Sequence, residues 1–166
     1  MSYTEIHGVA SNGEVAFVGQ TGNSWKGAYH VWSNLSEKYK VDIDKLEYLI
    51  DTDRIAEFES LILKSLGYMI VVSKVDIPIL LKAFKEYDEA YPGSTLIEQG
   101  EIIEEVIMKD DNMIGVCWNQ SSIEFGLWTV GLEHDDEGEV EYVPYNILRD
   151  QGHNYLNVGK QDYKII

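Results

Sequence analysis

Cysteine is almost absent from this sequence, because Cys117 is the only one. A single cysteine excludes a disulfide within the chain and also a zinc site made of cysteines alone. The four histidines do not have the spacing of a metal-ligand motif such as His-x-x-x-His. We therefore expect neither a bound metal ion nor another cofactor.

Long apolar runs are also missing. None approaches the roughly 20 residues that a helix needs to span a bilayer. The first residues, Met1 to Glu5, lack the basic start and the apolar stretch of a signal peptide. From these two absences we expect a protein without membrane contact. We expect it in the cytoplasm of the producing cell, or of the host cell if the protein is viral.

Basic residues are scarce, with 13 Lys and Arg against 29 Asp and Glu, and the net charge is −16. Proteins that bind the phosphate backbone need a positive surface, so this balance argues against direct nucleic-acid binding. The charge is also uneven. The first acidic segment, residues 98–111, has six acids and one Lys, and the second acidic segment, residues 133–141, has six acids and no base. Together they hold −11 of the total charge, which is the strongest functional signal in the sequence.

No internal repeat, low-complexity tract or long linker divides the chain. With 166 residues, of which 45% are hydrophobic, it is long enough to bury roughly 70% of its unfolded surface. We therefore expect a single globular domain over residues 1–166.

A strand followed by a helix is predicted at the centre of this domain. Residues 68–73 form a short apolar run rich in β-branched side chains, which is typical of a buried strand. From Ile77 to Tyr91 the apolar residues recur at steps of three and four, which predicts one buried helix face. We expect Asp76 to cap this helix and Pro78 to lie in its first turn.

The same periodicity predicts further helices. In the first of them, two tryptophans and two tyrosines share one face, and we interpret these aromatic residues as core. The last is expected to begin with a capping box of Thr95 and Glu98 and to expose a row of glutamates. The predicted ranges are about 24–39, 45–49, 53–66 and 95–108.

Two regions have β character. Residues 5–10 and 14–19 flank an Asn-Gly turn, which predicts an N-terminal hairpin. Alternating apolar residues return at 113–118, 123–132 and 140–147, and the tail from Arg149 is either irregular or a last edge strand. The expected fold class is α+β. Its largely antiparallel sheet consists of the N-terminal hairpin plus a C-terminal meander, packed by four to five helices.

Three motifs resemble functional sites, but each lacks a feature that the site requires. Residues 15–26 resemble a strand and P-loop, but counting from Gly19 the positions that need Gly-Lys-Ser/Thr hold Ser24-Trp25-Lys26, so we interpret the loop as a turn and helix cap. Cys117 with His134 or His153 would make a thiol and base pair, although a strand position favours a buried, inert thiol. The acidic loop 135–139 offers carboxylates for weak calcium binding but lacks EF-hand spacing.

Two main functional hypotheses remain. Beside them stand the possibility that the acidic segments serve solubility alone and the possibility that the chain is a subunit of a larger assembly, with the aromatic-rich segment 113–147 as its contact face. The first is a small acidic protein that binds and inhibits a basic partner, such as a nuclease or nucleic-acid-binding protein, as a toxin-immunity protein or a phage or mobile-element inhibitor does. Concentrated carboxylates speed association with a positive surface, and aromatic side chains supply the energetic centre. The predicted partner-binding residues are Glu98, Glu101, Glu104, Glu105, Asp110, Asp111, Glu133, Asp135, Asp136, Glu137, Trp118 and Trp128.

The alternative hypothesis is a small hydrolase without a recognisable motif. It would use scattered carboxylates, or Cys117 together with His153. We favour the binding protein, because no pattern of residues in the sequence assigns a catalytic role.

Overall fold

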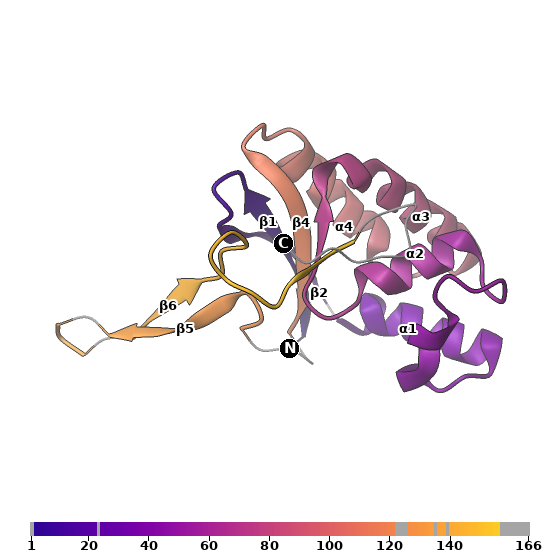
Figure 1. Cartoon of the computed structure of the whole chain (residues 1–166). Coiled ribbons are helices and arrows are strands. Elements are labelled where there is room, and N and C mark those ends of the chain that lie inside the picture. The colour runs from indigo at the N-terminus through magenta and orange to yellow at the C-terminus, as the bar shows by residue number, and fades with distance from the viewer. Residues whose placement is uncertain (1, 23, 122–125, 135, 139, 157–166) are drawn as a thin grey trace.

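A five-stranded sheet forms the centre of the computed structural model, which describes residues 2–22, 24–121, 126–134, 136–138 and 140–156 (Figure 1). The strand order is β2-β1-β4-β3-β7. Neighbouring strands are antiparallel, except that β3 and β7 are parallel. The predicted α+β class and largely antiparallel sheet are therefore confirmed. The strands are β1 (Tyr3–Ala10), β2 (Val15–Gly22), β3 (Ile70–Ser73), β4 (Met113–Gln120) and β7 (Asn154–Leu156).

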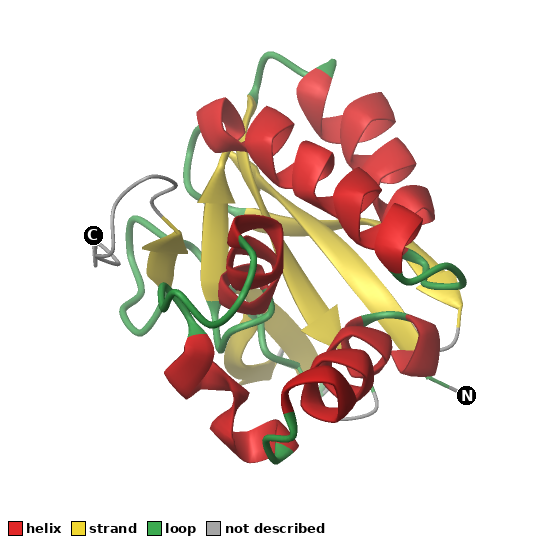
Figure 2. Ribbon diagram, turned by 90° about the vertical axis from the view of Figure 1, so that its right-hand side faces the viewer, coloured by secondary structure: helices red, strands yellow, loops and turns green. Residues whose placement is uncertain are grey.

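The helices lie on one side of this sheet (Figure 2). The last α-helix continues directly into a π-helical segment, and short 3-10 turns connect several of the other elements. The helices are α1 (Ala28–Tyr39), α2 (Glu57–Ser65), α3 (Ile77–Ala90), α4 (Leu96–Ile102) and the π-helical η4 (Ile103–Met108). The 3-10 turns are η1 (Ser24–Lys26), η2 (Ile43–Leu49) and η3 (Lys74–Asp76).

The strand and helix predicted at the centre of the fold are β3 and α3, and both belong to the main hydrophobic core between sheet and helices. Leu80, Phe84 and Tyr87 are buried on the predicted face of α3. The prediction that Asp76 caps this helix is wrong, because its side chain makes no capping hydrogen bond. A capping residue needs an extended backbone, whereas Asp76 is already helical within η3.

The N-terminal hairpin is formed as predicted by β1 and β2. Gly13 in its turn has a φ of +88°, a conformation that glycine adopts without steric cost. The predicted C-terminal meander is only partly present. β4 lies inside the main sheet, while β5 (Thr129–His134) and β6 (Val140–Pro144) pair only with each other. Residues 122–125, at the start of the predicted strand 123–132, lie outside the described residues.

The β5–β6 hairpin separates from the sheet because its base packs against the face opposite the helices. Trp128 and Tyr145 are buried there, beside Val71 and Cys117 of the sheet. The indole N–H of Trp128 donates to the carbonyl oxygen of Trp118 at 2.8 Å. The rest of the hairpin projects away from the body on the side opposite the helices (Figure 1).

The interpretation of the first aromatic face as core is wrong for two of its residues. Trp25 is 61% exposed and Tyr29 is 37% exposed, and their ring centroids lie 4.4 Å apart on the surface. Trp25 lies before a break at Gly27, between η1 and α1, which separates it from the buried stripe of α1. Tyr29 lies within α1 but not on that stripe. That stripe consists of Ala28, Val31 and Leu35.

A fully buried carboxylate, Glu59, fixes the start of α2. Its Oε1 atom accepts hydrogen bonds from the Ala56 N–H, at 2.9 Å, and from the Tyr39 hydroxyl. Its Oε2 atom lies 3.2 Å from the ammonium of Lys38. Glu59 therefore caps α2 and ties it to α1.

Candidate acidic groove

The first acidic segment runs beside β2, which forms one edge of the main sheet. Helix α4 approaches this strand closely at Gly19, because a Cβ atom there would lie only 2.8 Å from Cγ2 of Ile102. A side chain at position 19 would therefore push the helix away. Glycine at this position sets the distance between the strand and the first acidic segment.

A groove of about 450 Å³ lies between β2 and the helical segment formed by α4 and η4. Val18, Ile102 and Val106 supply its apolar lining, and residues 18–21 of β2 form one side. Glu98, Glu101 and Glu105 line the helical side, and no Lys or Arg does. We call this feature the acidic groove.

The three groove glutamates follow one line along the helical segment, because positions three and four residues apart share a helix face. Lys109 balances one of them, with its ammonium 2.8 Å from Oε2 of Glu105. Among the described residues, Glu98 and Glu101 form no ion pair. The groove therefore has an uncompensated negative charge at the end formed by α4.

The predicted capping box of Thr95 and Glu98 is absent. Thr95 has a nearly helical backbone, and its hydroxyl oxygen instead accepts a hydrogen bond from the Gln99 side chain at 3.1 Å. The Thr21 hydroxyl of β2 lies 3.3 Å from the same atom. Glu98 is therefore exposed at the groove rather than folded back onto the start of the helix.

The other predicted residues of the first acidic segment lie outside the groove. Glu104, Asp110 and Asp111 are exposed. Asp110 has a structural role, because its carboxylate accepts a hydrogen bond from the Asn112 N–H at 2.9 Å in the turn before β4. The structure thus brings together three of the six acids predicted for this segment.

The second acidic segment lies elsewhere on the molecule. Asp136 and Glu137 are exposed in the turn of the β5–β6 hairpin, and Glu133 lies in β5 opposite Glu141. Asp135 lies outside the described residues. Because the hairpin projects on the side of the sheet opposite the helices, the two acidic segments do not form one surface (Figure 1).

The aromatic anchors predicted for the partner are not accessible. Trp118 is 6% exposed and Trp128 is 3% exposed, so both side chains belong to the interior. The exposed aromatic pair is Trp25 and Tyr29. This pair lies near the start of α4, because the Lys26 carbonyl oxygen accepts a hydrogen bond from the Thr95 N–H at 2.7 Å. Gly27 is the sequence signal that would have separated Trp25 from the core.

The thiol and histidine of the alternative hypothesis are both buried. Burial raises the pKa of the Cys117 thiol well above its ordinary value, which favours the unreactive protonated form. His153 is hydrogen-bonded through Nδ1 to the Tyr145 hydroxyl at 2.6 Å, and burial lowers its pKa. These environments do not support nucleophilic catalysis by Cys117.

The part of the chain that the structure describes contains no group of three His, Cys, Asp or Glu side chains placed to hold a metal ion. Nor does this part contain a helix that is both long and apolar enough to cross a membrane.

No protein-family model, curated protein or solved structure matches this chain.

Proposed function

We propose that this protein binds a basic protein partner in the acidic groove and inhibits it by covering its nucleic-acid-binding surface. Three exposed carboxylates in a groove without a Lys or Arg in its lining carry the proposal. A toxin-immunity protein, or an inhibitor from a phage or mobile element, would act in the cytoplasm in this way. The partner's Lys and Arg side chains, which otherwise contact phosphates, would lie against Glu98, Glu101 and Glu105.

Electrostatic attraction gives such a complex a high association rate and selectivity for a positively charged partner. Clustered charge raises association rates by about 10- to 1,000-fold, and the effect falls steeply with ionic strength. Charge alone gives little affinity at an exposed surface, so an interface also needs buried apolar and aromatic contacts. Val18, Ile102 and Val106 offer these contacts inside the groove, and the exposed Trp25 and Tyr29 offer them near its α4 end.

The first experiment identifies the partner. The tagged protein is used to capture proteins from nuclease-treated lysate of its own source cell, and bound proteins are identified by mass spectrometry. We expect one basic protein in stoichiometric amount that is lost at high salt. Recovery of no basic partner at any salt concentration would contradict the proposal.

Kinetics with two matched variants then locate the contact. The groove variant is Glu98→Lys/Glu101→Lys, and the hairpin variant is Asp136→Lys/Glu137→Lys. Both change the net charge by the same amount, but only the first alters the acidic groove. At low salt we expect the groove variant to associate at least about tenfold more slowly, with a flatter salt dependence, and the hairpin variant to change much less.

Inhibition is measured in the same set of proteins. The wild-type protein and the hairpin variant are expected to block nucleic-acid binding by the captured partner, whereas the groove variant should not. An equal loss of inhibition in both variants would show that net charge, rather than the groove, governs the interaction.

A further inference from the structure

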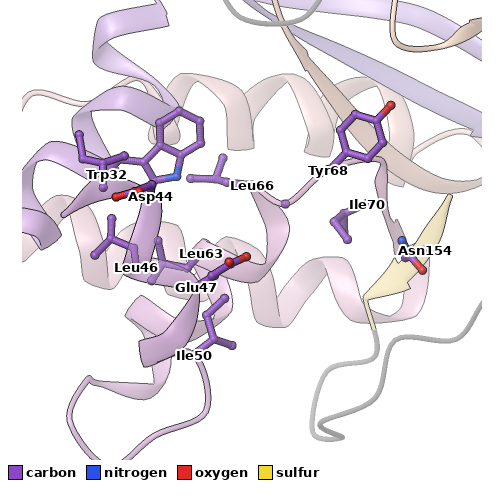
Figure 3. A pocket seen from close by; sticks show the side chains of 12 residues that line it. Trp32, Asp44, Leu46, Glu47, Ile50, Leu63, Leu66, Tyr68, Ile70 and Asn154 are labelled. Atoms are coloured by element: carbon purple, nitrogen blue, oxygen red, sulfur yellow. The ribbon is translucent and has the colours of Figure 1, made fainter. Parts of the chain in front are cut away.

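A second hollow, separate from the acidic groove, has a volume of about 480 Å³ (Figure 3). It lies between α1, η2, the end of α2, β3 and β7. Its walls are mainly apolar and include Trp32, Leu63, Leu66 and Ile70. Its volume falls within the roughly 300–1,000 Å³ that small-molecule sites occupy in proteins. We call it the η2 pocket.

The backbone explains why this space stays open. Helix α2 ends at Ser65, and the chain turns into β3 through Met69, which has a φ of +50°. This turn leaves Leu66 and Ile70 on either side of the hollow (Figure 3). Trp32 of α1 closes the side beyond Leu66, as the same view shows.

Two carboxylates line this pocket. They belong to Asp44 and Glu47, which are three residues, or one turn of a 3-10 helix, apart in η2. Both are exposed and both line the pocket, which has no Lys, Arg or His in its lining. Among the described residues neither forms an ion pair, whereas the neighbouring Asp42 pairs with Lys45 at 3.8 Å.

The chemistry of this lining selects one kind of occupant. Apolar walls favour an apolar body, and two uncompensated carboxylates favour a positive charge at one end. The indole of Trp32 and the ring of Tyr68, which also lines the pocket, add electron-rich faces that attract cations. An anionic ligand would meet repulsion from Asp44 and Glu47.

We propose that the η2 pocket binds a small organic cation with an apolar body and one protonated amine. The charged head lies between Asp44 and Glu47, and the apolar body lies against Leu63, Leu66 and Ile70. The proposal is independent of the acidic groove, because no residue lines both features.

Three small probes of similar size test the proposal on the full chain. They are 2-phenylethylamine, which is cationic at neutral pH, the neutral 2-phenylethanol and the anionic 3-phenylpropionate. We expect saturable shifts of the Trp32 indole and the Gly67 and Ile70 amides in ¹H–¹⁵N spectra with the amine, weaker shifts with the alcohol and none with the carboxylate. Equal binding of amine and alcohol, shifts confined to other residues, or no saturation by about 10 mM would overturn it.

A pair of variants tests the role of the carboxylates. Asp44→Asn/Glu47→Gln preserves shape and removes both charges, so amine affinity should fall about fivefold to thirtyfold while alcohol affinity stays unchanged. Asp42→Asn removes a charge from the same turn outside the pocket, and should change amine affinity less than about twofold. Unchanged amine affinity in the double variant, with an intact spectrum, would refute the proposed site.

Discussion

Replacing Glu59 with alanine is the most direct test of how the helical layer is held together. The carboxylate is fully buried and receives hydrogen bonds from the Ala56 N–H and the Tyr39 hydroxyl. Alanine removes both acceptor oxygens and leaves these two donors without their partner. It also removes the carboxylate that lies 3.2 Å from the ammonium of Lys38.

The loss in the free energy of unfolding follows from three contributions. A lost helix cap costs about 1 kcal/mol, and a lost hydrogen bond to an ionised acceptor, here from Tyr39, costs about 1.5 kcal/mol. The Lys38 side chain is 46% exposed, so its ion pair is screened by solvent and contributes about 0.5 kcal/mol. The expected total is about 3 kcal/mol. This corresponds to a fall of about 6–12 °C in Tm for a protein of this size.

Urea and thermal unfolding measured by circular dichroism give these quantities. Glu57→Ala is the matched control, because it removes an exposed acid from the same first turn of α2. We expect the control to lie within about 0.5 kcal/mol of wild type. A loss below about 1 kcal/mol for Glu59→Ala, or one equal to that of the control, would refute the role assigned to this carboxylate.

Two further predictions concern β2 and the second face of the sheet. Gly19→Ala should lower the free energy of unfolding by about 1–3 kcal/mol, because the new Cβ would lie 2.8 Å from Cγ2 of Ile102. Gly22→Ala is the control in the same unfolding assay. Its Cβ would meet no atom within 4 Å, so its free energy of unfolding should be nearly that of wild type. Because burial lowers the pKa of folded His153, the unfolded state binds more protons, and stability should fall as the pH drops below about 6.5. His153→Asn should reduce this slope in unfolding curves recorded between about pH 5.5 and 8. An unchanged slope would contradict the assignment.

Local sequence signals predicted the parts of the fold that local geometry determines. The β-branched run before Ile77 and the regular apolar spacing after it located β3 and α3. The Asn-Gly dipeptide located the turn of the N-terminal hairpin. In each case a few neighbouring residues fix the backbone, so no distant contact was needed to predict the element.

Features that depend on distant residues were missed. The predicted meander requires β4 and β5 to pair, but β4 pairs with β1 and β3 instead. The cap expected from Asp76 fails because the 3-10 turn η3 makes its backbone helical before α3 begins. The cap expected from Thr95 fails because its hydroxyl oxygen accepts a hydrogen bond from the Gln99 side chain and lies near Thr21 of β2. Sequence periodicity predicts neither the turn nor these contacts.

The candidate site shows the same division. The exposure of Glu98, Glu101 and Glu105 follows from the polar face of one helix, and the structure places all three along the groove. The groove itself required β2, a strand about 80 residues earlier in the chain, and so could not be predicted. Trp118 and Trp128 were chosen for their residue type, and only the tertiary structure shows that they are interior.

The strand order β2-β1-β4-β3-β7 determines when a growing chain can fold. Ile6 of β1 pairs with Trp118 of β4. The hairpin of β1 and β2 is therefore synthesised long before β4 can pair with the free edge of β1. Until then Ile6 and Val9, both fully buried in the finished protein, lack part of their cover. The parallel strand β7 joins last, at the far edge of the sheet. Until β4 is available, the N-terminal hairpin therefore exposes apolar surface, which makes a folding chain prone to aggregation.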